Sequence, residues 1–476
     1  MLESMHVEAL RRLLGNKGVL TAAPDLASYE TGARYDRGQA AAVLRPGSTE
    51  EVSAAVAYCV RHGIPLIAQS GNTGLVSGST PDDSGQEVVL SLDRMTDAFA
   101  LDIDNRSLRA GAGWRLSDVN RKLEEHGLFF PIDLGADPRL GGMLATNTGG
   151  SRFLKYGDVR RNTLGVTVVL ADDAGTILHL ASDLRKNNTG VDWKQIFIGT
   201  SGAFGIITEC VLNLEPLPRQ TATAYLVPRG DADVMPLLRA MEERLGSYLS
   251  AFEGMSANAI SAALEHVPSL RNPFERGEVP AYVILAEVSR SWAPREGEQS
   301  LDQVLEAVLA EIWESEAAPL ADAFVGPAHE MWALRHALSE GVKHSGRLIA
   351  FDLSFRRGDI MGFCARMRTE LPARSPTVRI CDFGHIADGG VHFNLVVPKD
   401  DPAAGDIDFE RRLRDLIFKV AVEDFNGSFS AEHAIGRKNQ RYYDLYTSRN
   451  IRDLAAGLKV LLSPGVLGRI EIVIAL

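Results

Sequence analysis

The sequence predicts an α+β fold divided into more than one domain. The chain has 476 residues, which is longer than one hydrophobic core usually supports. Helical and strand-like patterns alternate along it, and loops contain far less glycine after Pro216-Leu217-Pro218. We therefore expect a first domain over residues 1–216, a second over 217–425, and a C-terminal segment over 426–476 that returns to the first domain.

The first domain is expected to combine short strands with few helices. Ser48 and Glu51 form a capping-box pattern, which predicts a helix that ends at Gly63. A buried strand is predicted over 64–68. A further helix is predicted over 117–126, and further strands over 88–92, 98–104, 107–112, 163–170 and 176–180.

The second domain is expected to be a sheet with packed helices. Its patterns predict strands over 223–227, 281–288 and 348–353, and helices over 232–245 and 301–315. More helix is predicted within 403–425 and 437–462, and the apolar tail 470–476 predicts a terminal strand.

Composition restricts the classes of function. With 45% hydrophobic and 24% charged residues the chain is typical of soluble globular proteins, and its net charge of −12 argues against a nucleic-acid partner. The four cysteines form no CxxC pair, which disfavours a disulfide framework or a thiolate zinc site. The N-terminus lacks the pattern of a signal peptide and no apolar run reaches transmembrane length, so we expect a cytoplasmic protein.

Two glycine-rich stretches suggest a nucleotide site. Residues 69–79 follow a predicted strand and contain Gly71, Gly74 and Gly78, and residues 133–150 form a second such stretch. Small residues let backbone N–H groups converge on phosphate oxygens. Neither stretch is a GxGxxG or Walker motif, which disfavours a Rossmann NAD site. One such loop could be only a turn, but the second favours a flat, extended ligand.

A pair of histidines suggests a metal site. If Asp388-Gly389 form a two-residue turn, His385 lies directly opposite His392, with Cβ atoms about 4.5–5.5 Å apart. Both rings could then bind one divalent ion. Hydrogen-bonded core histidines are the alternative. Glu432-His433, which offers a carboxylate and a third imidazole, favours the metal.

Taken together, these motifs resemble the FAD-linked D-2-hydroxyacid dehydrogenases (D-lactate, glycolate and D-2-hydroxyglutarate dehydrogenases), a family of the vanillyl-alcohol-oxidase flavoprotein superfamily. The resemblance runs nearly end to end and rests on residues 65–74, 141–157, 186–190, 199–209, 384–394 and 430–433. It implies an FAD-binding domain of the vanillyl-alcohol-oxidase type, a ferredoxin-like α+β substrate domain and a C-terminal helical segment.

The resemblance also implies which residues bind FAD. Asn72 stands where some relatives carry the histidine that attaches FAD covalently, so non-covalent FAD is implied. The implied FAD-binding residues are Ser70, Gly71, Asn72, Thr73, Gly74, Leu75, Ser79, Asp133, Leu134, Gly142, Ala145, Thr146, Gly149, Gly150, Gly157 and Ile206.

The implied reaction is hydride transfer from the α-carbon of a 2-hydroxyacid to the flavin. A divalent metal, zinc by preference, on His385, His392 and Glu432 would stabilise charge on the substrate oxygens. His433 matches the family's general base, and Arg335 matches the arginine that holds the substrate carboxylate.

Further substrate contacts are expected from Ser339, one helical turn after Arg335, and from Asn394. Relatives that act on 2-hydroxyglutarate carry a lysine where Ala350 aligns here, which weakens the expectation of a diacid substrate.

Two other functions fit the same features. One is a flavin oxidase or a carbon–oxygen bond enzyme like the ether-lipid synthases, and the other is a non-catalytic nucleotide-binding protein with a structural metal. Expected partners are a small 2-hydroxyacid and an electron acceptor such as a quinone or an electron-transfer flavoprotein. Whether the chain forms a homodimer is left open.

Overall fold

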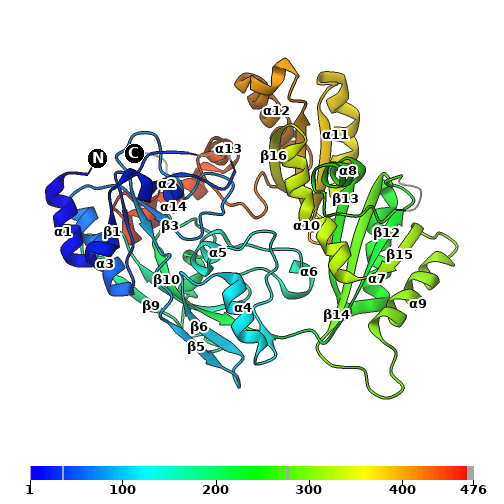
Figure 1. Cartoon of the computed structure of the whole chain (residues 1–476), viewed down its shortest axis with the longest axis horizontal. Coiled ribbons are helices and arrows are strands. Elements are labelled where there is room, and N and C mark those ends of the chain that lie inside the picture. Colours follow the sequence, from blue (N-terminus) through cyan, green and yellow to red (C-terminus); the bar gives the residue numbers. More distant parts are fainter. Residues whose placement is uncertain (1, 35–36, 275–277, 469–476) are drawn as a thin grey trace. The chain divides into compact units, whose positions relative to one another are not determined.

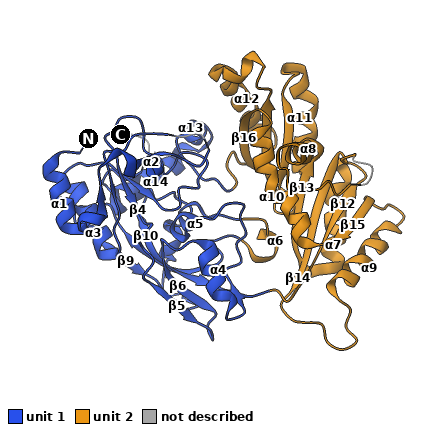
Figure 2. Ribbon diagram, in the orientation of Figure 1, with its two compact units in different colours: residues 1–149, 158–217, 432–476 blue, residues 150–157, 218–431 orange. Residues whose placement is uncertain are grey.

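We describe residues 2–34, 37–274 and 278–468 in a computed structural model of the chain (Figure 1). The strand predicted over 470–476 lies outside the described residues. The chain forms two compact units (Figure 2). Unit 1 contains residues 1–149, 158–217 and 432–476, and unit 2 contains residues 150–157 and 218–431.

Unit 1 contains two main sheets. The first has the strand order β1-β2-β4-β3 (Val19–Leu20, Ala42–Leu44, Val88–Ser91 and Leu66–Gln69), and β4 pairs in parallel with β2 and β3. The second is antiparallel, in the order β5-β6-β10-β8-β9 (Phe99–Asp102, Ser107–Gly111, Ile206–Asn213, Thr163–Val169 and Ile177–Leu180). Its helices include α1 (Ser4–Leu14), α2 (Ala23–Glu30), α3 (Thr49–Arg61), α4 (Leu116–Glu124) and α5 (Leu140–Thr146).

Local sequence signals predicted α3, α4 and most strands of these two sheets, but not α1, α2, α5, β1, β2 or β10. Helix α3 begins after Ser48, whose side chain accepts a hydrogen bond from the backbone N–H of Glu51 at 3.2 Å. It ends just before Gly63, which has a φ of +65° that favours glycine. The predicted hairpin of β8 and β9 is also present.

Of the C-terminal segment predicted over 426–476, residues 432–476 belong to unit 1 and residues 426–431 to unit 2. Residues 436–438 pack against the first glycine-rich loop. The backbone N–H of Lys438 donates to Val76 O at 3.2 Å, and Arg437 Nη2 donates to Thr80 O at 3.1 Å. A side chain at Gly436 would collide with the Val76 carbonyl. Helices α13 (Gln440–Tyr446) and α14 (Arg449–Leu462) follow, as predicted.

Unit 2 is built on a seven-stranded antiparallel sheet. The strand order is β15-β12-β14-β13-β17-β18-β16 (Leu320–Gly326, Gln220–Pro228, Tyr282–Arg290, Leu249–Ser256, Arg379–Gly384, Gly390–Val397 and Arg347–Ser354). Its helices are α6 (Phe153–Tyr156), α7 (Val234–Leu245), α8 (Ala257–His266), α9 (Leu301–Trp313), α10 (Ala328–His344), α11 (Ile360–Arg374) and α12 (Ile407–Lys419).

One face of this sheet packs against α8 and α10. Tyr225, Leu285, Met255 and Phe383 come from neighbouring strands and share a buried apolar cluster with Ile260 of α8 and other residues of both helices. Directly paired residues of antiparallel strands lie on the same face. This face therefore also carries the polar residues described below.

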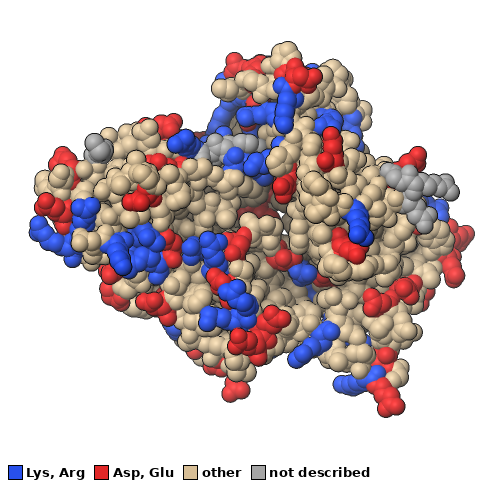
Figure 3. Space-filling model, in the orientation of Figure 1, with Lys and Arg blue, Asp and Glu red and all other residues tan. Residues whose placement is uncertain are grey.

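The surface carries charges of both signs. Acidic and basic side chains are interspersed over the face drawn in Figure 3. Within the described residues we find no helix that is both long and apolar enough to cross a membrane. The four cysteines are buried and form no disulfide.

Candidate active site

The histidine hairpin forms, but in a register that differs from the prediction. His392 pairs with Phe383 instead of His385, and residues 385–389 form a loop of five residues instead of a two-residue turn. Two hydrogen bonds account for the longer loop: the N–H groups of Asp388 and Gly390 both donate to His385 O, at 3.2 and 3.1 Å. Since the register differs by two residues, both histidines still lie on one face.

The predicted metal ligands come together in spite of this difference. The rings of His385 and His392 have centroids 5.3 Å apart. One potential ligand atom each from His385, His392 and Glu432 lie within 4.8 Å of one another. Asp352, His392 and His433 form a second, overlapping group by the same measure.

Each of the two hairpin histidines has a carboxylate at Nδ1. His385 Nδ1 lies 2.8 Å from Glu253 Oε1, and His392 Nδ1 lies 3.6 Å from Asp352 Oδ1. A carboxylate only accepts hydrogen bonds, so an imidazole that bonds to it through Nδ1 carries its proton there. For His385 this leaves Nε2 as the ligand atom, which is common in histidine metal sites. The separation of His392 Nδ1 from Asp352 is too long for a hydrogen bond, so it does not fix the tautomer of His392.

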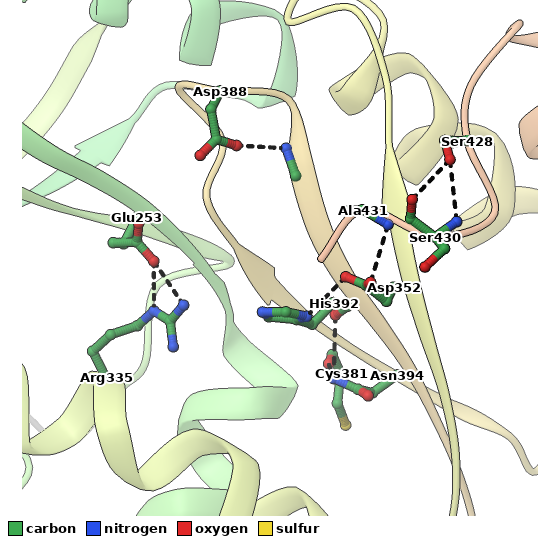
Figure 4. A network of polar contacts seen from close by, with 11 residues as sticks. Glu253, Arg335, Asp352, Cys381, Asp388, His392, Asn394, Ser428, Ser430 and Ala431 are labelled. Atoms are coloured by element: carbon green, nitrogen blue, oxygen red, sulfur yellow. Dashed lines mark hydrogen bonds and ion pairs between the residues drawn. The ribbon is translucent and has the colours of Figure 1, made fainter. Parts of the chain in front are cut away.

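Glu253 on β13 joins this hairpin to helix α10, through His385 on one side and Arg335 on the other. Figure 4 shows the contact with Arg335. Its Oε2 accepts from Arg335 Nε at 2.9 Å and from Nη2 at 2.6 Å. Burial by itself would raise the pKa of Glu253, but the charges and hydrogen bonds of His385 and Arg335 lower it to about 2. The carboxylate is therefore ionised.

Asp352 fixes the backbone that leads to Glu432. It pairs with His392 across β16 and β18, and its Oδ2 accepts from the Ala431 N–H at 3.0 Å (Figure 4). Ala431 precedes the Glu432-His433 pair directly. Ala434 then takes a left-handed conformation, with φ of +59°.

The predicted substrate residues differ in exposure. Arg335 is buried, whereas Ser339, one turn later on α10, is exposed. Asn394 is buried, and its Nδ2 donates to the carbonyls of Cys381 at 3.3 Å and His392 at 3.2 Å. Ala350 pairs with Asn394 across β16 and β18, so both lie on the face that carries His392.

The first glycine-rich loop of unit 1 is held at both ends. Gln69 is buried, and its Nε2 donates to Tyr29 O at 2.9 Å and to Ser79 O at 2.8 Å. Asn72 has a φ of +52°, donates to Thr31 O at 2.8 Å and accepts from Ser79 Oγ at 2.9 Å. The loop therefore has a defined shape that exposes backbone between fixed ends.

The second stretch lies against the first. Gly71 and Gly142 approach each other closely enough that a side chain at Gly142 would contact Ser70 and the Gly71 backbone. Helix α5 carries Gly142, Ala145 and Thr146, and ends at Asn147 in a left-handed conformation. Two glycine-rich backbones side by side form the kind of surface that a dinucleotide needs.

Comparisons with known proteins agree with this geometry. Residues 40–181 match an FAD-binding domain, and residues 217–466 match the C-terminal domain of FAD-linked oxidases. The mitochondrial D-2-hydroxyglutarate dehydrogenase of Rattus norvegicus is 34% identical over 433 residues, which cover 90% of this chain and 77% of the relative. The probable mitochondrial D-2-hydroxyglutarate dehydrogenase of Oryza sativa subsp. japonica is 31% identical over 475 residues, covering 98% of this chain and 80% of the relative.

The chain belongs to the FAD-linked D-2-hydroxyacid dehydrogenase family. It is an FAD-dependent oxidoreductase, as predicted. A solved structure of alkyldihydroxyacetonephosphate synthase aligns with a TM-score of 0.71 and covers 99% of this chain and 84% of its own, at 15% identity. That likeness shows a shared fold, which confirms the vanillyl-alcohol-oxidase type.

Sequence reasoning missed two polar residues of this dehydrogenase. Asp352 lies in a predicted strand, and its place two residues after Ala350 could have put it on the same face as the histidines. Glu253 gave no such signal, because Glu and Gly in residues 249–256 are unusual for a strand and β13 was not predicted.

Proposed function

We propose that this protein oxidises a D-2-hydroxyacid to the 2-oxoacid, with FAD as hydride acceptor and a divalent metal bound by His385, His392 and Glu432. The observation that carries the metal is the convergence of these three donors within 4.8 Å, together with the carboxylates at both histidine Nδ1 atoms. Two imidazoles and one carboxylate suit zinc with a position left open for substrate, and neutral imidazoles also suit iron or manganese.

Each cofactor contributes one kind of chemistry. FAD accepts the hydride, and the metal acts as a Lewis acid toward the substrate hydroxyl and carboxylate oxygens. The glycine-rich loops support non-covalent binding of FAD, because the side chain of Asn72 is already engaged with Thr31 and Ser79.

The protein side chains handle the proton and the carboxylate. As the Cα–H bond breaks with its electron pair, His433 accepts the hydroxyl proton and the carbonyl forms. Arg335 holds the substrate carboxylate. Its Nε and Nη2 donate to Glu253, whereas Nη1 makes no hydrogen bond to other described residues and can donate to the substrate. Ser339 adds a hydrogen bond to the same group, and Asn394 adds one when its Nδ2 exchanges the Cys381 carbonyl for the substrate carboxylate.

The site favours a small hydroxyacid such as D-lactate over a diacid. Ala350 gives no cation on the face shared with Asn394, and the nearby Arg347 is paired with Glu410 at 2.9 Å. The similar relatives are named as D-2-hydroxyglutarate dehydrogenases, so a diacid must be tested beside D-lactate. For reoxidation we propose a quinone or an electron-transfer flavoprotein in the cytoplasm.

Anaerobic reduction of the bound flavin tests this proposal. Purified protein is mixed with the D- and L-forms of lactate, malate and 2-hydroxyglutarate, with and without a chelator. We expect the flavin absorbance to bleach with D-forms only, and chelation to slow bleaching by at least about a hundredfold. Bleaching at the same rate with and without the chelator would exclude a role for the metal in the reaction. No bleaching by any hydroxyacid would favour the carbon–oxygen bond chemistry of an ether-lipid synthase.

A further inference from the structure

The carboxylate of Glu253 is the strongest feature that the reaction above does not use. The residue is 1% exposed and holds side chains from two separate elements of unit 2. Its Oε1 lies 2.8 Å from His385 Nδ1, and its Oε2 accepts both bonds from Arg335. One buried carboxylate thus contacts both a metal-ligand candidate and a substrate-binding candidate.

We propose that Glu253 is a positioning residue that prepares His385 to bind the metal and Arg335 to bind the substrate carboxylate. This inference rests on the proposed function, since it assigns a role relative to the metal and the hydroxyacid. Glu253 itself touches neither.

The first part of the argument concerns the histidine tautomer. Both N–H bonds of Arg335 go to Glu253 Oε2, which leaves Oε1 as the acceptor 2.8 Å from His385 Nδ1. Nδ1 must then carry the proton, and the lone pair stands on Nε2. Without this partner the ring could rotate or carry its proton on Nε2, where it would block the ligand atom.

The second part concerns the arginine. A guanidinium has a side edge, made by Nε and Nη2, and an end, made by Nη1 and Nη2. Glu253 occupies the side edge, and the ring of Phe383 lies 5.2 Å from Arg335 Cζ. These contacts fix the plane of the guanidinium and leave its end for a second carboxylate.

Glu287 on the adjacent strand is a matched control. It is also 1% exposed, it pairs with Arg152 at 2.9 Å, and it accepts from Trp332 of α10 at 2.8 Å. Its carboxylate bonds to Arg152, Ser250 and Trp332 and, among the described residues, to neither hairpin histidine nor Glu432. If the loss of any buried carboxylate weakens zinc binding, Gln at either position should raise the zinc Kd. If the positioning of His385 is what matters, only Glu253→Gln should raise it.

Glu253→Gln is the diagnostic variant because an amide has one accepting oxygen. If that oxygen faces Arg335, the amide NH₂ faces His385 and favours the tautomer with the proton on Nε2. We expect the zinc Kd of FAD-loaded protein, measured by equilibrium dialysis, to rise about 10–100-fold. At saturating zinc the KM for D-lactate should rise more than kcat falls. Glu253→Asp should recover part of both effects.

The outcomes separate this inference from the proposed function. If wild-type protein binds no zinc in dialysis, the proposed metal is wrong. If wild type binds zinc but Glu253→Gln shows the same Kd and KM, or Glu287→Gln raises the zinc Kd equally, the positioning role is wrong. If Glu253→Gln does not fold, ¹⁵N NMR of metal-free wild type is the alternative test, with the His385 signals assigned by comparison with His385→Asn. We expect the His385 ring to carry its proton on Nδ1. A proton on Nε2 would overturn the inference.

Discussion

In the proposed function, Ala350 is the residue on the sheet face that disfavours a diacid substrate. It pairs with Asn394 and lies two residues before Asp352, so its Cβ points to the face that carries His392. A methyl group there offers no charge to a second carboxylate. The resemblance to the family pointed to this position from the sequence, and the strand register places it on the face of Asn394 and His392.

The variant Ala350→Lys tests this role. An ammonium on this face should attract the distal carboxylate of a diacid, and one partly screened ion pair corresponds to roughly 1 kcal/mol. We expect the ratio of kcat/KM for D-2-hydroxyglutarate over D-lactate to rise by about 5–10-fold. Ala350→Met, which adds length without charge, is the control and should lower both values together. An unchanged ratio in the lysine variant would place the distal carboxylate elsewhere.

Lys459 on α14 carries a pH effect that a sequence could not show. Its Nζ donates to Ala203 O at 2.8 Å, and burial lowers its pKa to about 8 from 10.5. Below pH 8 the ammonium is charged in both states, so burial destabilises the folded protein. Between pH 8 and 10.5 the unfolded chain holds the proton that the folded chain has released, so stability rises with pH.

Lys459→Met removes this titration. We expect the unfolding free energy of wild type, relative to the variant, to increase between pH 8 and 10 by on the order of 1–3 kcal/mol, and to stay level from pH 6 to 7.5. Urea unfolding at several pH values measures the difference. If the difference in unfolding free energy between wild type and Lys459→Met is constant from pH 6 to 10, the Lys459 ammonium has the same pKa in the folded and unfolded chain.

At the scale of elements, the sequence predicted those with local signals and missed those set by tertiary contacts. Helix α3 was predicted from its cap, and β8 and β9 from their turn. Strand β13 was missed because Glu253 and Gly254 suit a strand only in this context: Glu253 meets Arg335, and a side chain at Gly254 would collide with Tyr282. The predicted register of the histidine hairpin was wrong for a similar reason, because His385 O accepts hydrogen bonds from two N–H groups within the loop.

The short segment around α6 shows the same limit. Residues 150–157 carry two of the glycines implied for FAD binding, yet they belong to unit 2. Arg152 holds them there through a bidentate pair with Glu287, at 2.9 and 3.0 Å, and Lys155 Nζ donates to Ser289 Oγ at 2.9 Å. No local pattern predicts which sheet such a segment joins.

Glu287→Gln should therefore destabilise this segment strongly. Burial would raise the pKa of Glu287, but the charge and hydrogen bonds of Arg152 lower it, so the pair is ionised. Removing one member of a buried pair leaves a buried charge, and we expect a loss of about 2–4 kcal/mol in unfolding free energy. Flavin should also dissociate faster during gel filtration.

Glu242→Gln provides the comparison. Glu242 pairs with Arg357 at 2.6 Å, but the two side chains are 32% and 44% exposed. Such a pair contributes about 0–1 kcal/mol. Urea unfolding of the three proteins gives the ranking, and equal losses for both variants would show that the Arg152 pair is solvated.

For the whole molecule, the candidate cofactor sites fall on different parts of the chain. The glycine-rich loops at 69–79 and 133–149 belong to unit 1, as does Glu432, and both histidines of the hairpin belong to unit 2. The sequence predicted a boundary at residue 216, but not that 150–157 would leave the first domain. The residues proposed for the metal are not among those proposed for FAD, so we expect each cofactor to be removable without loss of the other.

Hydrogen exchange after chelation tests this independence. A bound metal stabilises the state that binds it, by about 2.7 kcal/mol at a hundredfold excess over Kd. Adding chelator to the FAD-loaded protein should speed amide exchange in residues 384–392 and 428–433, because these backbones carry or adjoin the ligands. Exchange in residues 69–79 should stay unchanged, and the flavin should still elute with the protein. If chelation also speeds exchange in residues 69–79, or releases the flavin, the metal stabilises the FAD site. The two cofactors would then bind cooperatively.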